Sequence, residues 1–134
     1  MILVDSSVLI DFLEGRENPP VDRFIDILDH DIPFGISPLT ILEVLQGAAT
    51  EKDFATLREY LGSQTVYDLA GGLESYAEAA KIFFDLRKKG MSVGSSMDFL
   101  IAQTAIEHGL SLLHNDSDFD RIAKVSSLKI YQCR

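Results

Sequence analysis

The sequence predicts a three-layer α/β/α sandwich around a central, mostly parallel, five-stranded sheet, formed by residues 1–134 as a single domain. Two observations support this class. Short apolar segments rich in branched residues alternate along the chain with segments whose apolar residues recur at helical spacing. Such alternation is typical of βαβ units with parallel strands. A chain of 134 residues also buries roughly two-thirds of its unfolded surface, which is enough for a core without disulfides.

In the first half of the chain, capping residues and prolines mark the helix starts. Pro19 and Pro20 open a helix whose apolar residues recur at helical spacing. Ser37 and Pro38 form another start, because serine caps free backbone N–H groups and proline is tolerated in the first turn. In chain order we expect a strand at 2–4, helices at 7–14 and from 19 onwards, a strand at 33–36, and helices from 38 to about 47 and at 51–61.

In the second half, residues 65–69 are β-branched and aromatic, which favours a strand. The long helix that follows ends in cations and glycine, both of which suit a helix C-terminus. Ser95 or Ser96 caps the next helix. In chain order we expect a strand at 65–69, helices at 73–89 and 97–108, a strand at 110–113, a short helix at 119–124 and a strand at 128–131.

The net charge is −9, from 12 basic and 21 acidic residues. Proteins that bind nucleic acid by overall charge neutralise phosphates with lysine and arginine, so this composition argues against that class. It does not exclude an enzyme that reaches phosphate through a bound metal ion. The acidity also suits a basic protein partner.

The single cysteine, Cys133, excludes an intrachain disulfide and suits a reducing cytoplasm. No uncharged run approaches the roughly 18 residues that a membrane span needs. Asp5 interrupts the apolar start too early for a signal peptide. We therefore expect a cytoplasmic protein without a membrane partner.

Two aspartates follow predicted strands. Asp5 comes directly after residues 2–4, and Asp116 follows residues 110–113. In parallel α/β sheets, ligand sites form at the carboxyl ends of the strands. Each aspartate is equally well explained as the cap of the next helix, so neither establishes a site alone.

Two further acids lie on helix faces that we expect to be apolar. Glu43 shares a face with Leu39, Leu42 and Gln46, at spacings that normally point to a core. Asp98 shares its face with Ile101, Ala102 and Ala105. A buried carboxylate without a partner becomes protonated or acquires a cation. Asp98 also stands in a first helical turn, where the helix dipole favours an anion.

The predicted architecture brings these four acids, Asp5, Glu43, Asp98 and Asp116, to one rim of the sheet. A cluster of carboxylate oxygens repels itself strongly and matches hard cations such as Mg²⁺ or Mn²⁺. His30, His108 and His114 are scattered and offer no rival metal site. We interpret His114 as packed or solvated rather than catalytic. The sequence lacks the motifs of serine hydrolases, P-loop nucleotide hydrolases and dinucleotide-binding enzymes.

Three stretches carry a resemblance to a known family: "ILVDSSVLIDFLEG" at the start, "SPLTILEVLQG" around Glu43, and "SSMDFLIAQTAIEHGLSLLHNDSDF" around Asp98 and Asp116. In this order, and with four acids in a chain of this length, they resemble the PIN-domain nucleases, specifically the VapC-type toxins of prokaryotic toxin–antitoxin pairs. The resemblance covers nearly the whole chain.

The resemblance implies an Mg²⁺-dependent ribonuclease, with Mn²⁺ as the alternative ion. Asp5 and Asp98 would be the principal metal ligands, and Glu43 and Asp116 would complete the catalytic cluster. One or two ions would activate a water for in-line attack on a phosphodiester, leaving a 3′-hydroxyl and a 5′-phosphate. Asp118 competes with Asp116 for the fourth position, and Asp116 is preferred because it falls first after the strand.

A few local groups would position the RNA. Ser6 and Ser7 would orient Asp5 or a bound water, and Asn115 and Asp118 would flank the fourth acid. The candidate cations are Arg16, Arg87, Lys88 and Lys89, which are equally well explained as solvated residues at helix ends. The resemblance also implies a homodimer, formed either by the third and fourth helices or by the face that carries Tyr76, Phe83 and Phe84, and silencing by a cognate antitoxin that inserts a peptide into the acidic cleft.

Three other functions are alternatives to a nuclease. A receiver-like phosphoacceptor requires paired acids after the first strand and a lysine after the fifth, and a haloacid-dehalogenase-like phosphatase requires a second aspartate two residues after Asp5, where Ser7 stands. Neither pattern is present. A PIN-like binding module without catalysis keeps the fold and stays open as the alternative.

Overall fold

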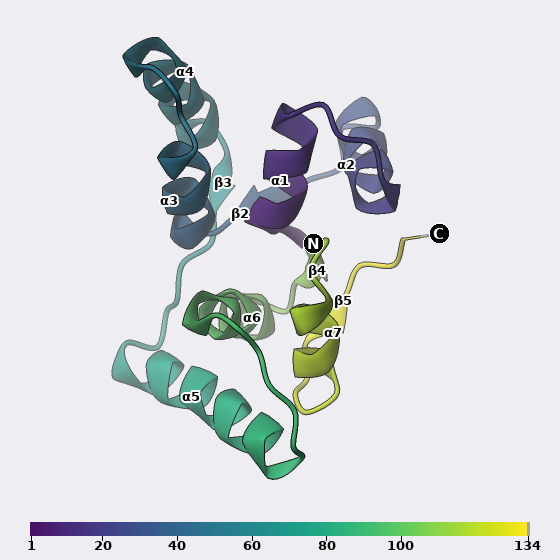
Figure 1. Ribbon diagram of the computed structural model, residues 1–134, viewed down its shortest axis with the longest axis vertical. Coiled ribbons are helices and arrows are strands. Elements are labelled where there is room, and N and C mark those ends of the chain that lie inside the picture. Colours follow the sequence, from purple (N-terminus) through teal and green to yellow (C-terminus); the bar gives the residue numbers. More distant parts are fainter. Residues whose placement is uncertain (134) are drawn as a thin grey trace.

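The computed structural model describes residues 1–133 and contains a five-stranded sheet in the order β3-β2-β1-β4-β5 (Figure 1). Each pairing between neighbouring strands is parallel. The α/β/α class expected from the sequence is confirmed, and the sheet is parallel throughout rather than mostly so. The strands are β1 (Ile2–Val4), β2 (Phe34–Ile36), β3 (Thr65–Val66), β4 (Ser111–Leu113) and β5 (Lys129–Ile130).

Helices cover both faces of the sheet. Because side chains alternate along a strand, Ile2 and Val4 pack in one core and Leu3 packs in the other. The first core lies under α1–α4 and the second under α5–α7, on opposite sides of the sheet (Figure 1). The helices are α1 (Ser6–Leu13), α2 (Pro19–Asp29), α3 (Pro38–Gln46), α4 (Glu51–Gly62), α5 (Leu73–Lys88), α6 (Ser96–His108) and α7 (Ser117–Ala123).

Element boundaries differ from the prediction where side chains cap the backbone. The expected strand 65–69 ends at Val66; the Tyr67 N–H still donates to the Ile36 carbonyl at 2.8 Å, and the Asp68 carboxylate then accepts from the Leu69 N–H at 2.8 Å. The short helix expected at 119–124 begins two residues earlier, because the Asp116 carboxylate accepts from the Asp118 N–H at 3.0 Å.

One glycine is required by packing. A Cβ built on Gly35 in β2 would collide with the ring of Tyr67. Tyr67 follows β3 and its N–H donates to the Ile36 carbonyl at 2.8 Å, so the ring is held across the glycine. The absence of a side chain at residue 35 is therefore what lets β3 join the sheet edge with this aromatic residue above it.

The strand order places a topological switch point beside β1, which has β2 on one side and β4 on the other. The crossovers from the two neighbours run to opposite faces, so the carboxyl ends of β1 and β4 face an open crevice. The Asp5 N–H donates to the Leu113 carbonyl at 3.0 Å and joins these two strand ends directly. Asp5 and Asp116 therefore follow the strands that flank the switch point.

Among the described residues, no helix combines the length and the apolar composition that crossing a membrane requires.

Candidate metal centre

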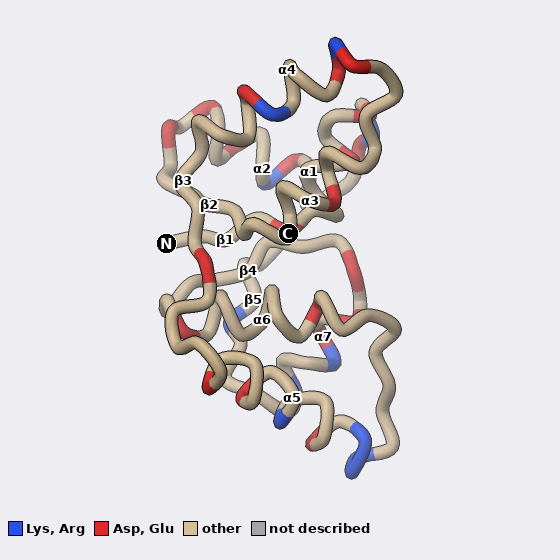
Figure 2. Tube along the Cα trace, turned by 90° about the vertical axis from the view of Figure 1, so that its left-hand side faces the viewer, with Lys and Arg blue, Asp and Glu red and all other residues tan. Residues whose placement is uncertain are grey.

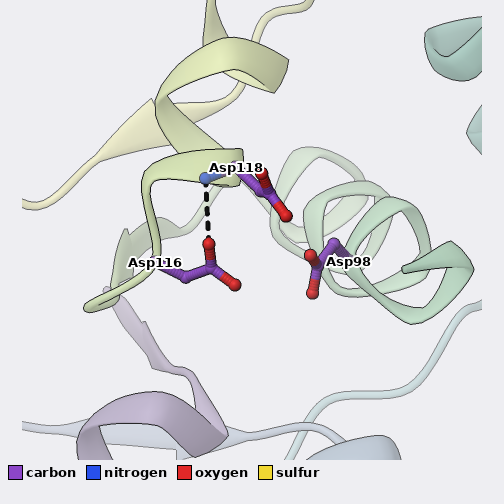
Figure 3. Close-up of side chains that lie close together, drawn as sticks. All are labelled: Asp98, Asp116 and Asp118. Carbon is purple, nitrogen blue, oxygen red and sulfur yellow. Dashed lines mark hydrogen bonds between the residues drawn. The ribbon is translucent and has the colours of Figure 1, made fainter. Parts of the chain in front are cut away.

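Three carboxylates meet where α6 and α7 begin. Asp98 stands in the first turn of α6, Asp116 is the N-cap of α7, and Asp118 stands in the first turn of α7. One carboxylate oxygen of each residue lies within 4.8 Å of the other two, and all three side chains are half-buried. Figure 3 shows the three carboxylates facing a common space. The three carboxylates meet because α6 and α7 both begin at the same edge of the parallel sheet.

Asp5 lies deeper, at the end of β1 and the start of α1, and is only 5% exposed. Its Oδ2 accepts hydrogen bonds from the Ser7 N–H at 3.1 Å and from the Ser7 Oγ at 2.7 Å. Burial raises the pKa of the Asp5 carboxyl above its ordinary value, the Ser7 hydrogen bonds offset part of that rise, and the charge of Glu43 adds to it. No basic side chain within residues 1–133 pairs with Asp5, and a buried acid without such a partner favours a proton or a metal ion.

Glu43 is half-buried on α3. The prediction that it shares a core-facing side with Leu42 and Gln46 is wrong, since Leu42 is 49% exposed, Gln46 is exposed, and the buried residues of α3 are Thr40 and Val44. Glu43 instead lies at the edge of the buried face. Its charge still acts on Asp5 and on Asp98, so the acid stands within electrostatic reach of both.

Asp98 connects the whole set. Its pKa is raised to about 7, first by burial and then by the charges of Asp116, Asp5, Asp118 and Glu43, in that order. On its own helix, Ile101, Ala102 and Ala105 are buried, as expected from their spacing. Each of the four acids singled out in the sequence therefore contributes to one electrostatic cluster, and Asp118 joins them.

Asp116 and Asp118 differ in what already balances their charge. The Arg121 guanidinium donates to Asp118 Oδ1 at 2.5 Å, and the Gly94 N–H donates to Oδ2 at 3.4 Å. Within residues 1–133, Asp116 forms no ion pair and accepts only the helix-capping hydrogen bond from the Asp118 N–H. Asp116 is thus the more available anion, and Asp118 is already partly neutralised.

A hydrogen-bond network of Ser7, Asn115 and Asp11 holds Asp5 in place. The part played by Asp11 was not predicted from the sequence. Ser7 Oγ donates to Asp5 and accepts from the Asn115 N–H at 2.9 Å. Asp11 accepts from the Asn115 side-chain amide at 2.9 Å and from Arg16 at 2.8 Å. The available signal was the i, i+4 spacing of Ser7 and Asp11, which places both on one face of α1.

Several residues predicted to contact RNA are engaged within the protein. Ser6 is 4% exposed, and it is Ser7 that orients Asp5. Arg16 pairs with Asp11 at 2.8 Å and with Glu14 at 2.6 Å, so its charge is balanced locally. Asn115 is exposed and its amide is held by Asp11. Their roles in RNA binding stay predictions.

His114 is a structural residue at the end of β4. Its Nδ1 accepts from the Asp116 N–H at 3.1 Å, its Nε2 lies 3.4 Å from Asp120 Oδ1, and its ring packs against Phe119 with centroids 5.1 Å apart. The ring therefore fixes the turn that carries Asp116, which agrees with our interpretation of His114 as a packed residue.

The donor set fits a hard divalent cation. The oxygens of Asp98, Asp116 and Asp118 are close enough to share one ion, and the neighbouring Asp5 and Glu43 add negative charge. Histidine nitrogen and cysteine sulfur, which zinc favours, are absent from this group of ligand atoms. An ion would remove the repulsion that raises the pKa of Asp98.

Fold and site together define a class: a parallel α/β protein with a carboxylate cluster at its switch point, whose oxygen donors fit a divalent cation. The PIN domain family matches residues 2–125, and the chain belongs to this family. It is 32% identical over 136 residues to Ribonuclease VapC1 of Rickettsia felis, and 27% identical over 130 residues to Ribonuclease VapC11 of Mycobacterium tuberculosis, with 96% of each chain covered in both cases. The resemblance to VapC-type members is thereby confirmed.

A solved structure shows the same fold. The crystal structure of VapBC2 from Rickettsia felis, bound to a DNA fragment from its promoter, matches with a TM-score of 0.73 at 18% identity and covers 98% of both chains. Membership of the PIN family excludes the receiver-like and dehalogenase-like alternatives for this chain.

Proposed function

We propose that this chain is a metal-dependent endoribonuclease and the toxin of a type II toxin–antitoxin pair. The observation that carries the proposal is the carboxylate cluster around Asp98, where the charges of four acids from α3, α7 and the end of β1 act on an acid of α6. The family and the ribonuclease names of its relatives support the choice of chemistry. We place the activity in the cytoplasm, where RNA is abundant.

Asp98 and Asp116 would hold the ion, with Asp5 and Glu43 completing the ligand set directly or through water. Mg²⁺ is the ion we propose, because oxygen-only sites suit it and it accepts water among its ligands. When bound, the cation supplies positive charge that activates a water and neutralises the phosphate under attack. Hydrolysis would leave a 3′-hydroxyl and a 5′-phosphate.

The chain's own residues keep the ligands in place. Ser7 holds Asp5 through its hydroxyl and its N–H, and the same hydroxyl accepts from the Asn115 N–H, so the ends of β1 and β4 keep one spacing. Arg121 holds Asp118 beside Asp116, and the α7 cap fixes the Asp116 carboxylate. Fixing ligands through a second layer of hydrogen bonds is what maintains metal affinity in such sites.

The test is cleavage of total cellular RNA by the purified chain with Mg²⁺, with Mn²⁺ and with EDTA. We expect discrete fragments that require metal and that an Asp98→Asn variant does not produce. Glu78→Gln on α5 is the matched control, because Glu78 is exposed and forms no ion pair among the described residues. Asp98→Asn should lower the rate by on the order of 100-fold or more, since it removes a charge from the ligand set.

No cleavage by folded protein at several metal concentrations would contradict the proposal and favour the binding-module alternative. Cleavage that survives both EDTA and Asp98→Asn would mean that the activity belongs to a contaminating nuclease. Mapping the fragment ends would then identify the RNA and show whether a 5′-phosphate is left.

The proposed partners are an RNA substrate, a cognate antitoxin and a second copy of the chain. The VapBC2 complex, which shares the fold, supports the antitoxin. Two apolar surfaces stay exposed for self-association: Leu42 (49%) and Phe54 (45%) on α3 and α4, and Tyr76 (56%) and Phe84 (55%) on α5. Sedimentation of Leu42→Glu and Tyr76→Glu variants decides between them, because only the variant in the dimer interface should become monomeric.

A further inference from the structure

A hollow lies apart from the acid cluster, between the end of α5 and the turn that follows α7. Its volume is about 570 Å³. The two helices reach it with their C-terminal ends, so it gathers side chains from distant parts of the sequence. The lining residues are Asp85, Lys88, Lys89, Lys124, Val125 and Ser126.

The hollow is positive although the chain as a whole is negative. Its one acid, Asp85, is paired with Lys81 at 2.7 Å. Its three lysines are exposed and form no ion pair within residues 1–133. The Lys88 ammonium lies 5.5 Å from the centroid of the Phe84 ring, a cation–π contact that leaves its charge without an anionic partner. Figure 2 shows basic residues gathered at the end of α5.

Helix dipoles do not account for this charge. Each helix C-terminus carries roughly half a negative charge, so the ends of α5 and α7 together balance about one lysine. Lys88, Lys89 and Lys124 supply three positive charges. About two charges are therefore in surplus, and they face one open space instead of spreading over the surface. Such an arrangement attracts an anion with several oxygens.

The hollow is also placed at a definite distance from the acid cluster. Helix α7 begins at the cluster with Asp116 and Asp118 and ends at Lys124, so its length of about 10 Å separates the two sites. The Gly94 N–H, in the connection between α5 and α6, donates to Asp118. In Figure 1 this connection passes beside α7, from the end of α5 to the start of α6. The distance is short enough for one RNA strand to reach both sites.

We propose that the hollow, here called the lysine pocket (Lys88, Lys89 and Lys124), binds a phosphate of the RNA strand whose cleaved bond lies at the acid cluster. This inference rests on the proposed ribonuclease function and adds a subsite that fixes the strand a short distance from the cut. The pocket also explains how a chain with a net charge of −9 holds a polyanion: the binding charge is concentrated along one path beside α7.

The test measures RNA binding in EDTA, where cleavage is suppressed. Fluorescence anisotropy of a short labelled single-stranded oligoribonucleotide gives the affinity at each of several salt concentrations. The pocket variant is Lys88→Ala/Lys124→Ala. The control is Lys52→Ala/Arg58→Ala on α4, which removes the same charge from two exposed residues at the other end of the molecule (Figure 2). Circular dichroism checks that both variants are folded.

We expect the pocket variant to bind about tenfold more weakly at low salt, and its plot of log affinity against log salt concentration to be less steep by about 0.7, the value for one lost phosphate contact on a single strand. The control should match wild type. Inorganic phosphate should compete with RNA on the wild type at lower concentration than on the pocket variant.

Equal losses in both variants would overturn the pocket, because they would reflect net charge alone. An unchanged RNA affinity, with loss of binding to polyglutamate in the pocket variant only, would overturn it in favour of an acidic peptide. Wild-type protein that cleaves RNA with metal but shows no RNA affinity in EDTA would overturn the pocket and leave the nuclease intact. Wild-type protein that binds RNA through the pocket but does not cleave it would contradict the nuclease and leave the pocket intact.

Discussion

At the scale of single residues, the centre depends on carboxylates that the free protein holds at an electrostatic cost. Burial raises the pKa of both Asp5 and Asp98, and the charges of the neighbouring carboxylates raise that of Asp98 further. These two residues were recognisable in the sequence because a charge at a strand end or on an apolar helix face is chemically anomalous. Ser7 was expected to orient Asp5, but its link to Asn115 and the part played by Asp11 were not predicted, because Asn115 lies more than a hundred positions away in the chain.

Removing one charge should stabilise the metal-free protein. In EDTA at pH 8, Asp98→Asn should raise the melting temperature, since it relieves repulsion from Asp116, Asp5 and Asp118. Addition of Mg²⁺ should then stabilise wild type and leave the variant nearly unchanged. Differential scanning calorimetry with Glu78→Gln as control measures both effects. A lower melting temperature for Asp98→Asn in EDTA would contradict the repulsion that we describe.

The stability of the metal-free protein should depend on pH with a definite sign. The folded-state pKa of Asp98 is raised from 3.8 to about 7, so the protonated carboxyl favours folding. This contribution is complete below about pH 4 and is lost as the pH rises through about 7. A cation competes with that proton, so the increase in melting temperature caused by Mg²⁺ should be larger at pH 8 than at pH 6. An equal increase at both values would contradict a protonated Asp98.

The Ser7 hydroxyl should matter more for metal affinity than for folding. Ser7→Ala removes a hydrogen bond to Asp5 and one from Asn115, which should lower the free energy of unfolding by about 1–2 kcal/mol. Metal affinity should fall by roughly 10–100-fold, because Asp5 loses its fixed orientation. Calorimetric titration with Mn²⁺ tests this, with Ser63→Ala as the control for loss of an exposed hydroxyl. Equal affinities in all three proteins would assign Ser7 to folding alone.

At the scale of elements, the local signals predicted the existence and order of the helices and strands better than their ends. Helix starts at Ser37 and Ser95 carry the expected caps. The prediction of the buried face of α3 was wrong, because the helix packs through Thr40 and Val44. Which face is buried depends on the elements packed against the helix and not on its own sequence alone. Likewise, β3 is shorter than its β-branched and aromatic residues predicted, because only Thr65 and Val66 pair with β2 as a strand.

The close approach of β2 and the Tyr67 ring gives a prediction about elements. Gly35→Ala should lower the free energy of unfolding by about 1–3 kcal/mol, because its Cβ overlaps the ring. Gly62→Ala at the end of α4 is the matched substitution, since nothing lies within 4 Å of a Cβ there. That change should be neutral or slightly stabilising. Urea unfolding measures both, and equal effects would contradict the packing of β3 against Gly35.

At the scale of the whole molecule, the parallel sheet brings together residues from β1, α3, α6 and α7 that are far apart in the chain. The parallel α/β class could be predicted from the alternation of strand-like and helix-like segments. In that class, Asp5 and Asp116 are expected at the edge of the sheet where the parallel strands end. The lysine pocket could not be predicted, because it depends on where α5 and α7 end relative to each other. An acidic chain thus presents an acid cluster for metal and a basic hollow about one short helix away.

The measurement that tests this account most directly is a titration of Mn²⁺ with the protein. Electron paramagnetic resonance gives the concentration of unbound Mn²⁺ at each step. We predict saturable binding to wild type and to Glu78→Gln, and strongly weakened binding to Asp98→Asn and Asp116→Asn, with a smaller loss in Asp118→Asn, whose carboxylate Arg121 already balances. Binding that is equal in every variant, or absent from folded wild type, would contradict a metal centre at the switch point.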